Sequence, residues 1–119
     1  MSKDLLKPKS AKEGELERPL YYKLKGRKVR PVWDIAEWVP YFETADRILQ
    51  QEKIGTTVVS TVFLGIDHGY MGGPPLLFET MVFGGPLDQE QVRCSTYDEA
   101  EEQHEDMVKR VKEAQREST

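Results

Sequence analysis

The chain has 119 residues, of which 38% are hydrophobic and 32% are charged, and its formal net charge is −4. This length suits one domain with a single hydrophobic core and is too short for two. The sequence holds no apolar run long enough to span a membrane and does not open with a signal-peptide pattern. The lone Cys94 has no partner for an internal disulfide. We therefore expect a protein of a reducing cytosol that makes no membrane contact.

The charges are distributed unevenly along the chain. Residues 1–31 carry ten Lys and Arg against four Asp and Glu, whereas residues 32–119 carry seven against seventeen. Residues 1–18 have little to bury, so we expect a disordered or extended basic arm there. The sequence predicts a single domain at residues 19–115 and a frayed tail at 116–119. The basic arm could follow phosphates, but the body is acidic and shows no nucleic-acid motif, so a nucleic-acid partner is disfavoured.

The first part of the domain is expected to form a hairpin and a helix. Two short strand patterns, 20–24 and 27–33, flank Lys25–Gly26, a plausible tight turn. Asp34 is then placed to cap a helix, with Glu37 as its capping-box partner. The helical spacing predicts one buried face, made of Ile35, Trp38, Val39 and Phe42.

Two segments after the start of this helix need separate interpretation. Pro40 predicts a kink or an irregular first turn, and the helix should end near Ala45 or Asp46. Residues 47–54 could continue the helix or form a strand. We favour a strand that pairs with residues 56–66 through a turn at Ile54–Gly55.

Most of the apolar mass lies in residues 57–85. β-branched and aromatic residues dominate two runs, 58–66 and 76–83, which favours strands over helices. Both faces of these strands carry apolar residues, so we expect central strands that are covered on both sides within the chain, or on one side with a subunit contact on the other. The loop 67–75 between them is rich in Gly and Pro and is too long for a two-residue hairpin turn.

The C-terminal part predicts a short strand, 91–94, and a long helix. Thr96 and Glu99 form a second capping box. The helix carries one apolar stripe, on which His104 is expected to be packed and hydrogen-bonded; the stripe comprises Tyr97, Ala100, His104, Met107, Val108, Val111 and Ala114. Together the patterns predict an α+β fold: a mostly antiparallel sheet of hairpins with two helices packed on one face.

The segments VSTVFLGIDH and GGPPLLFETMVFGG resemble a family of small uncharacterised proteins encoded by tailed bacteriophages and prophages. The similarity runs from about Trp33 to Lys112 and includes the helix pattern EAEEQHEDMVKRV. It implies a phage accessory protein in the host cytoplasm and implies no particular activity.

The candidate ligand-binding residues lie in and around the central loop. Asp67, His68 and Tyr70 belong to the loop, and Glu79 and Arg93 belong to neighbouring strands. Asp commonly binds the backbone of its own turn, so loop anchoring is the main alternative to a role in ligand binding. For Glu79 an ion pair with Arg93 or Arg47 is favoured over a catalytic role. No nucleophile–base pair, metal-ligand motif or phosphate loop is present in the sequence, so we expect no catalytic residue, no metal and no cofactor.

Three functions are compatible with these features. The first is a non-enzymatic phage accessory protein that binds a host protein or assembles with its own copies, most simply as a homodimer. The second is a protein that binds or sequesters a small nucleotide-like ligand and so counters host defence. The third is a small metal-dependent hydrolase built on Asp67, His68 and Glu79.

Overall fold

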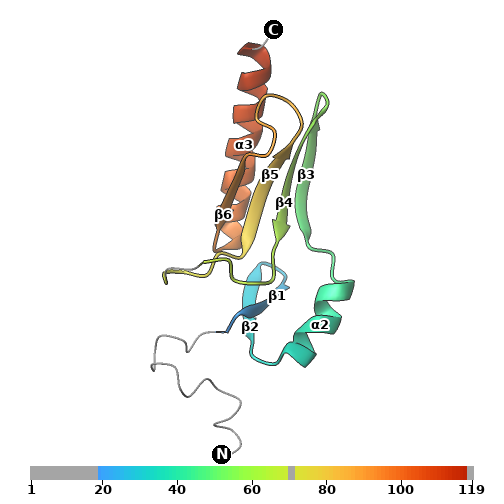
Figure 1. Ribbon diagram of the computed structural model, residues 1–119, viewed down its shortest axis with the longest axis vertical. Helices are drawn as coiled ribbons and strands as arrows, with labels where there is room; N and C mark the ends of the chain where they lie inside the picture. The colour runs from blue at the N-terminus through green and yellow to red at the C-terminus, as the bar shows by residue number, and fades with distance from the viewer. Residues whose placement is uncertain (1–18, 70–71, 118–119) are drawn as a thin grey trace, which may run out of the picture.

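The computed structural model describes residues 19–69 and 72–117, which form two antiparallel sheets and two helices (Figure 1). Strands β1 (Tyr21–Lys25) and β2 (Lys28–Val32) make a hairpin, and helix α2 (Ile35–Thr44) packs on it. Strands β3 (Ile48–Ile54), β4 (Thr57–Phe63), β5 (Phe78–Phe83) and β6 (Gln91–Cys94) form the second sheet in that order. Helix α3 (Tyr97–Glu117) lies along this second sheet.

The α+β class and the antiparallel meander are confirmed, including the strand preferred at 47–54. The two helices divide between the sheets, since α2 contacts β1 and β2 whereas α3 contacts all four strands of the larger sheet. The expected basic arm lies outside the described residues. At the other end α3 continues to Glu117, two residues past the expected domain boundary.

Alternation along β4 and β5 builds the core. Val59 and Phe63 of β4, with Phe78 and Val82 of β5, point toward α3 and are fully buried. They belong to two apolar clusters, which share the α3 side of the sheet. One cluster comprises Tyr22, Phe63, Leu77, Phe78 and Ala100, and the other comprises Val59, Val82, Met107, Val108 and Val111. The stripe expected on α3 is therefore the face that closes the core.

The caps of α3 form as predicted. The Thr96 hydroxyl accepts from the Glu99 N–H at 3.1 Å, and the Glu99 carboxylate accepts from the Thr96 N–H at 3.1 Å. At α2 the prediction holds only in part. Asp34 accepts from the Ala36 N–H at 3.0 Å, but Glu37 takes a hydrogen bond from Lys23 at 3.2 Å.

The buried face expected on α2 is wrong for two residues. Trp38 is buried and its indole N–H donates to the Tyr22 carbonyl at 3.0 Å. Ile35 is 49% exposed and Val39 is 37% exposed. The physical reason is that α2 packs on a two-stranded hairpin, which is too narrow to cover a wide helical stripe. Pro40 lies inside α2, which continues to Thr44 as expected.

The hairpin is tied to the end of the larger sheet. Tyr22 N–H donates to the Gly65 carbonyl at 2.9 Å, and Tyr21 forms a bridge with Ile66. Gly65 has φ +79°, and a Cβ there would lie 3.3 Å from the Phe42 ring. A glycine therefore suits this junction on two grounds, the backbone conformation and the close approach of α2.

Candidate functional site

The predicted loop site turns out to be a backbone anchor at Asp67. Its Oδ1 accepts from the Gly69 N–H at 2.7 Å and from the Leu76 N–H at 2.9 Å, which holds the two ends of the loop together. His68 is half-buried, and its N–H donates to the Leu76 carbonyl at 3.1 Å. Tyr70 lies outside the described residues. Asp67 thus has the anchoring role that was the alternative to ligand binding.

Glu79 and Arg93 form the cross-strand ion pair that was one of the sequence-based expectations. They are direct partners on β5 and β6, with Nη2 to Oε2 at 3.0 Å and Nε to Oε2 at 3.1 Å. Both side chains are partly buried on the face of the sheet away from α3. The pair neutralises the one charge inside the β5 run, so Glu79 is not a free acid or base.

No three His, Cys, Asp or Glu residues within 19–69 and 72–117 lie close enough together to hold a metal ion. Asp67, His68 and Glu79, on which the hydrolase alternative was built, therefore do not form such a group. Helices in the same ranges also include none that is long and apolar enough to cross a membrane.

A buried polar chain crosses the core between the two apolar clusters. The side-chain amide of Gln103 donates to the Thr80 hydroxyl at 3.0 Å and to the Val92 carbonyl at 3.3 Å. The Thr80 and Thr61 hydroxyls are 2.6 Å apart, and Thr61 Oγ1 lies 2.7 Å from Nδ1 of His104. Thr61, Thr80 and His104 are each no more than 1% exposed. Hydrogen bonds between these side chains offset the cost of burying their hydroxyl and amide groups.

The hydrogen bonds that link Gln103, Thr80, Thr61 and His104 run in one donor-to-acceptor direction, and this direction sets the tautomer of His104. Val92 offers only a carbonyl, so the Gln103 group that contacts it is the NH₂ donor. Thr80 then accepts from Gln103 and is free to donate its proton to Thr61, which in turn donates to Nδ1 of His104. In the opposite direction the Thr80 proton would lack a recipient in the chain. His104 Nδ1 is therefore the acceptor, and Nε2 of the neutral ring carries the proton.

That Nε2–H is buried and has no hydrogen-bond partner. The nearest carboxylate oxygen belongs to Glu52, at 3.9 Å, which is too far for a hydrogen bond. Burial lowers the pKa of the His104 imidazole below its usual range, and attraction from Glu52 and Glu105 offsets this only in part. An unpaired buried donor costs free energy, and among the described residues this position is shared only with Nε of Arg47.

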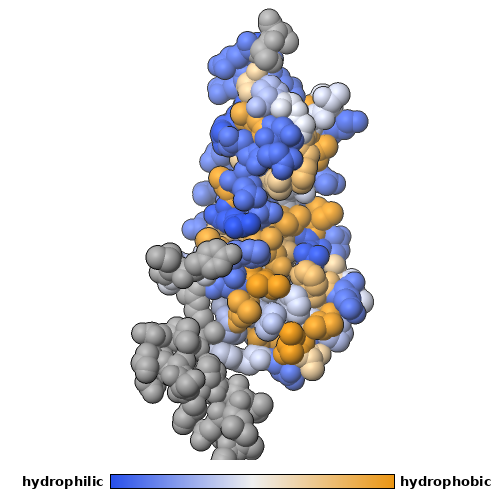
Figure 2. All heavy atoms as spheres, in the orientation of Figure 1, coloured by the Kyte–Doolittle hydropathy of each residue, from blue (hydrophilic) through white to orange (hydrophobic). Residues whose placement is uncertain are grey.

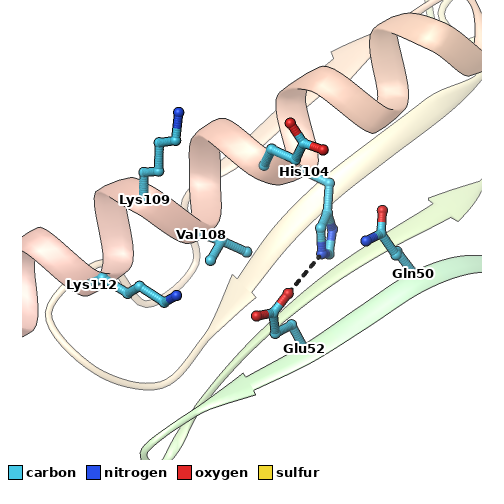
Figure 3. A pocket seen from close by; sticks show the side chains of 7 residues that line it. Gln50, Glu52, His104, Val108, Lys109 and Lys112 are labelled. Carbon is cyan, nitrogen blue, oxygen red and sulfur yellow. Dashed lines mark ion pairs between the residues drawn. The ribbon is translucent and has the colours of Figure 1, made fainter.

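A cleft opens beside this donor, between β3 and α3 (Figure 3). The cleft is open to solvent, has a volume of about 230 Å³ and is lined by Gln50, Glu52, His104, Glu105, Val108, Lys109 and Lys112. Figure 3 shows His104 directed at Glu52, with Val108 between the histidine and Lys112. Lys112 extends along the cleft toward the Glu52 side, whereas Lys109 points away from the sheet.

A β-bulge explains why polar residues of β3 face this cleft. Ile48 pairs with Val62, but the register then shifts, and Gln50 pairs with Thr61 and Glu52 with Val59. Directly paired residues share a face, so the extra residue turns Gln50 and Glu52 toward α3. β3 is also an edge strand of the sheet, and this leaves Glu52 half-exposed beside the helix.

The arrangement of Thr61, His104 and Glu52 is not a catalytic triad. It places a hydroxyl, an imidazole and a carboxylate in a row. A nucleophile must reach its substrate, and Thr61 is 1% exposed beneath α3. The part of the row that a molecule in the cleft meets is the half-exposed Glu52 carboxylate, because Nε2 of His104 has almost no exposed surface. A ligand that displaces this carboxylate slightly would meet Nε2 next.

A second surface is the face of the four-stranded sheet opposite α3, which we term the open face. Alternation and register place five apolar side chains on it: Ile48, Val58, Val62, Met81 and Phe83. Ile48 is 51% exposed and Phe83 is 45% exposed. Figure 2 shows apolar side chains gathered over the middle of the molecule and continuing toward the α2 end. The open face matches the prediction that apolar residues occupy both faces of the central strands.

Sequence reasoning missed the cleft but placed His104 on the correct helical stripe. Its packed, hydrogen-bonded environment is confirmed, and the unpaired Nε2 is an additional feature that the sequence did not indicate. The one available signal was a single histidine within an otherwise apolar stripe. Comparison with family models, with curated proteins and with solved structures found no match.

Proposed function

We propose that this chain is a non-enzymatic accessory protein of a tailed phage, acting in the host cytoplasm, and that it assembles as a homodimer through the open face. The resemblance of residues 33–112 to phage and prophage proteins supports the phage setting. Binding is favoured over catalysis because Asp67 serves the loop backbone and Glu79 is neutralised by Arg93.

The observation that carries the proposal is an apolar face with few charges on an acidic body. Residues 32–119 hold ten more acidic than basic side chains, so the acidic surfaces of two copies repel each other. The open face contributes little to this repulsion, because Glu79 pairs with Arg93 within one chain and the register adds the cation Lys53 to the same face. Its apolar side chains then gain free energy when a second sheet stacks on them.

A second copy fits this face better than an unrelated protein does. In a two-fold contact the same patch meets itself, so the surface must be compatible with its own charge pattern. Glu79–Arg93 meets that condition, and Phe83 and Ile48 supply exposed apolar contact area toward opposite ends of their strands.

The test is the oligomeric state of the full chain, measured by sedimentation velocity over a concentration series. The parent should be a dimer, and Phe83→Lys should weaken the dimer by at least about tenfold. Ile35→Lys is the matched control, because Ile35 is a similarly exposed apolar residue on α2. A parent that stays monomeric at high concentration would overturn the dimer and leave a host protein as the partner of the open face.

A further inference from the structure

We propose that the cleft between β3 and α3 binds a hydroxyl-bearing phosphate ester, with a ligand hydroxyl between His104 and Glu52 and the phosphate beside Lys112. The two proposed surfaces lie on opposite sides of the sheet, so this site does not depend on the dimer. The argument begins from the buried Nε2–H of His104, which the Thr61–Thr80–Gln103 chain fixes in place.

The group that fits between His104 and Glu52 must accept one hydrogen bond and donate another. Nε2–H offers a proton, and the Glu52 carboxylate needs one. The two atoms are 3.9 Å apart and Nε2 has almost no exposed surface, so Glu52 must move outward before an oxygen can lie within hydrogen-bond distance of both groups. A phosphate or carboxylate oxygen at this position would be repelled by Glu52, and an ammonium could not accept from Nε2–H.

The remaining residues of the cleft indicate which chemical group lies at the other end of the ligand. Val108 lies between the histidine and Lys112, so it offers an apolar surface to a short carbon skeleton (Figure 3). Lys112 extends into the cleft and presents an ammonium that suits a phosphate. Glu105 lines the same cleft one position after His104 and disfavours an anion at that end. The anion therefore belongs at the Lys112 end.

The cleft is open to solvent and has a volume of about 230 Å³, so it can hold the sugar and phosphate of a small ester while any further group lies in solvent. The carboxylate of Glu52 lies beside Nε2 and is half-exposed. A change of its rotamer is the movement that lets the hydroxyl reach the histidine.

The experiment measures binding to the full chain by titration calorimetry and by the ¹⁵N resonance of His104 Nε2. The probes are ribose 5-phosphate, AMP, ribose and inorganic phosphate. Ribose 5-phosphate should bind, and Glu52→Gln should weaken it by about tenfold or more. Glu105→Gln is the matched control, because it removes the other carboxylate of the cleft without touching the hydroxyl position. It should leave binding equal or slightly tighter.

The phosphate end is tested separately. Lys112→Gln should weaken ribose 5-phosphate by about tenfold and leave the ribose-induced shift of His104 unchanged. Lys53→Gln, on the face opposite the cleft, should have no effect. If AMP binds more tightly than ribose 5-phosphate, the ligand is a nucleotide; if both bind equally, the sugar phosphate is the whole recognised unit.

Two results would overturn the proposal. The first is an absence of saturable ribose 5-phosphate binding up to about 10 mM, together with an unperturbed His104 resonance. The second is inorganic phosphate that binds as tightly as the ester and is insensitive to Glu52→Gln, which would leave only attraction to lysines. His104→Ala removes a fully buried ring, so the half-exposed Glu52 is the better position for the deciding variant.

Discussion

Acidification should destabilise this protein through His104, and the size of the effect follows from its burial. The ring is 1% exposed, and burial lowers its pKa in the folded state. In the unfolded chain the histidine titrates near its ordinary value of about 6.5. Below that value the unfolded state binds more protons than the folded state, so acid favours unfolding. The contribution of neutral His104 is complete above about pH 6.5 and is lost as the pH falls below it.

The magnitude has an upper limit set by one proton. If His104 stays neutral in the folded protein, lowering the pH from about 7.5 to about 5.5 reduces the free energy of unfolding by up to about 1.4 kcal/mol. Protonation of the folded state at the lower pH would reduce this value, and attraction from Glu52 and Glu105 acts in that direction.

Urea unfolding at the two pH values, followed by circular dichroism, measures the effect. His104→Gln supplies the comparison, because glutamine does not titrate and can still accept a hydrogen bond from Thr61. The parent should lose more stability than this variant. His68→Gln controls for the other histidine and should behave as the parent does. Equal losses in the parent and in His104→Gln would refute the reasoning, since His104 would then titrate alike in both states.

Three further outcomes are expected. Val111→Asp should abolish or severely reduce the cooperative melting transition, because Val111 is 1% exposed in the core and a buried carboxylate would have no partner; an unchanged transition would show that the stripe does not face the sheet. Thr96→Ala should lower the free energy of unfolding by about 1 kcal/mol through loss of the α3 cap, and an unchanged urea midpoint would contradict this. Burial, with repulsion from Glu99, raises the pKa of the Cys94 thiol to about 11. Alkylation of Cys94 at pH 8 should therefore be much slower in the folded protein than in urea. Equal alkylation rates would contradict the prediction.

The parts of the fold that the sequence predicted well depend on local chemistry. The capping box Thr96–Glu99 and the stripe on α3 concern neighbouring turns of one helix, so periodicity alone determines them. The ion pair Glu79–Arg93 needed only the pairing of two consecutive strands. α2 was predicted less well, because exposure of Ile35 and Val39 depends on how wide a partner the helix meets, and that is a tertiary property.

The cleft depends on features that periodicity does not carry. Glu52 and His104 are brought together from β3 and α3, and the β3 sequence ILQQEKI has no alternation to say which residues face the helix. The bulge between Ile48 and Gln50 determines that Gln50 and Glu52 face the helix. Whether Nε2–H of His104 finds a hydrogen-bond partner likewise depends on the packing of residues that are distant in the sequence.

β4 links the two proposed surfaces, because successive side chains of a strand point to opposite faces. Thr61 points toward α3 and fixes His104, whereas Val62 next to it lies on the open face. Substitution at Phe83 therefore alters the proposed dimer without touching the cleft, and substitution at Glu52 alters the cleft without touching the open face. Loss of ribose 5-phosphate binding in Phe83→Lys, with its fold intact, would show that the cleft is complete only in the dimer.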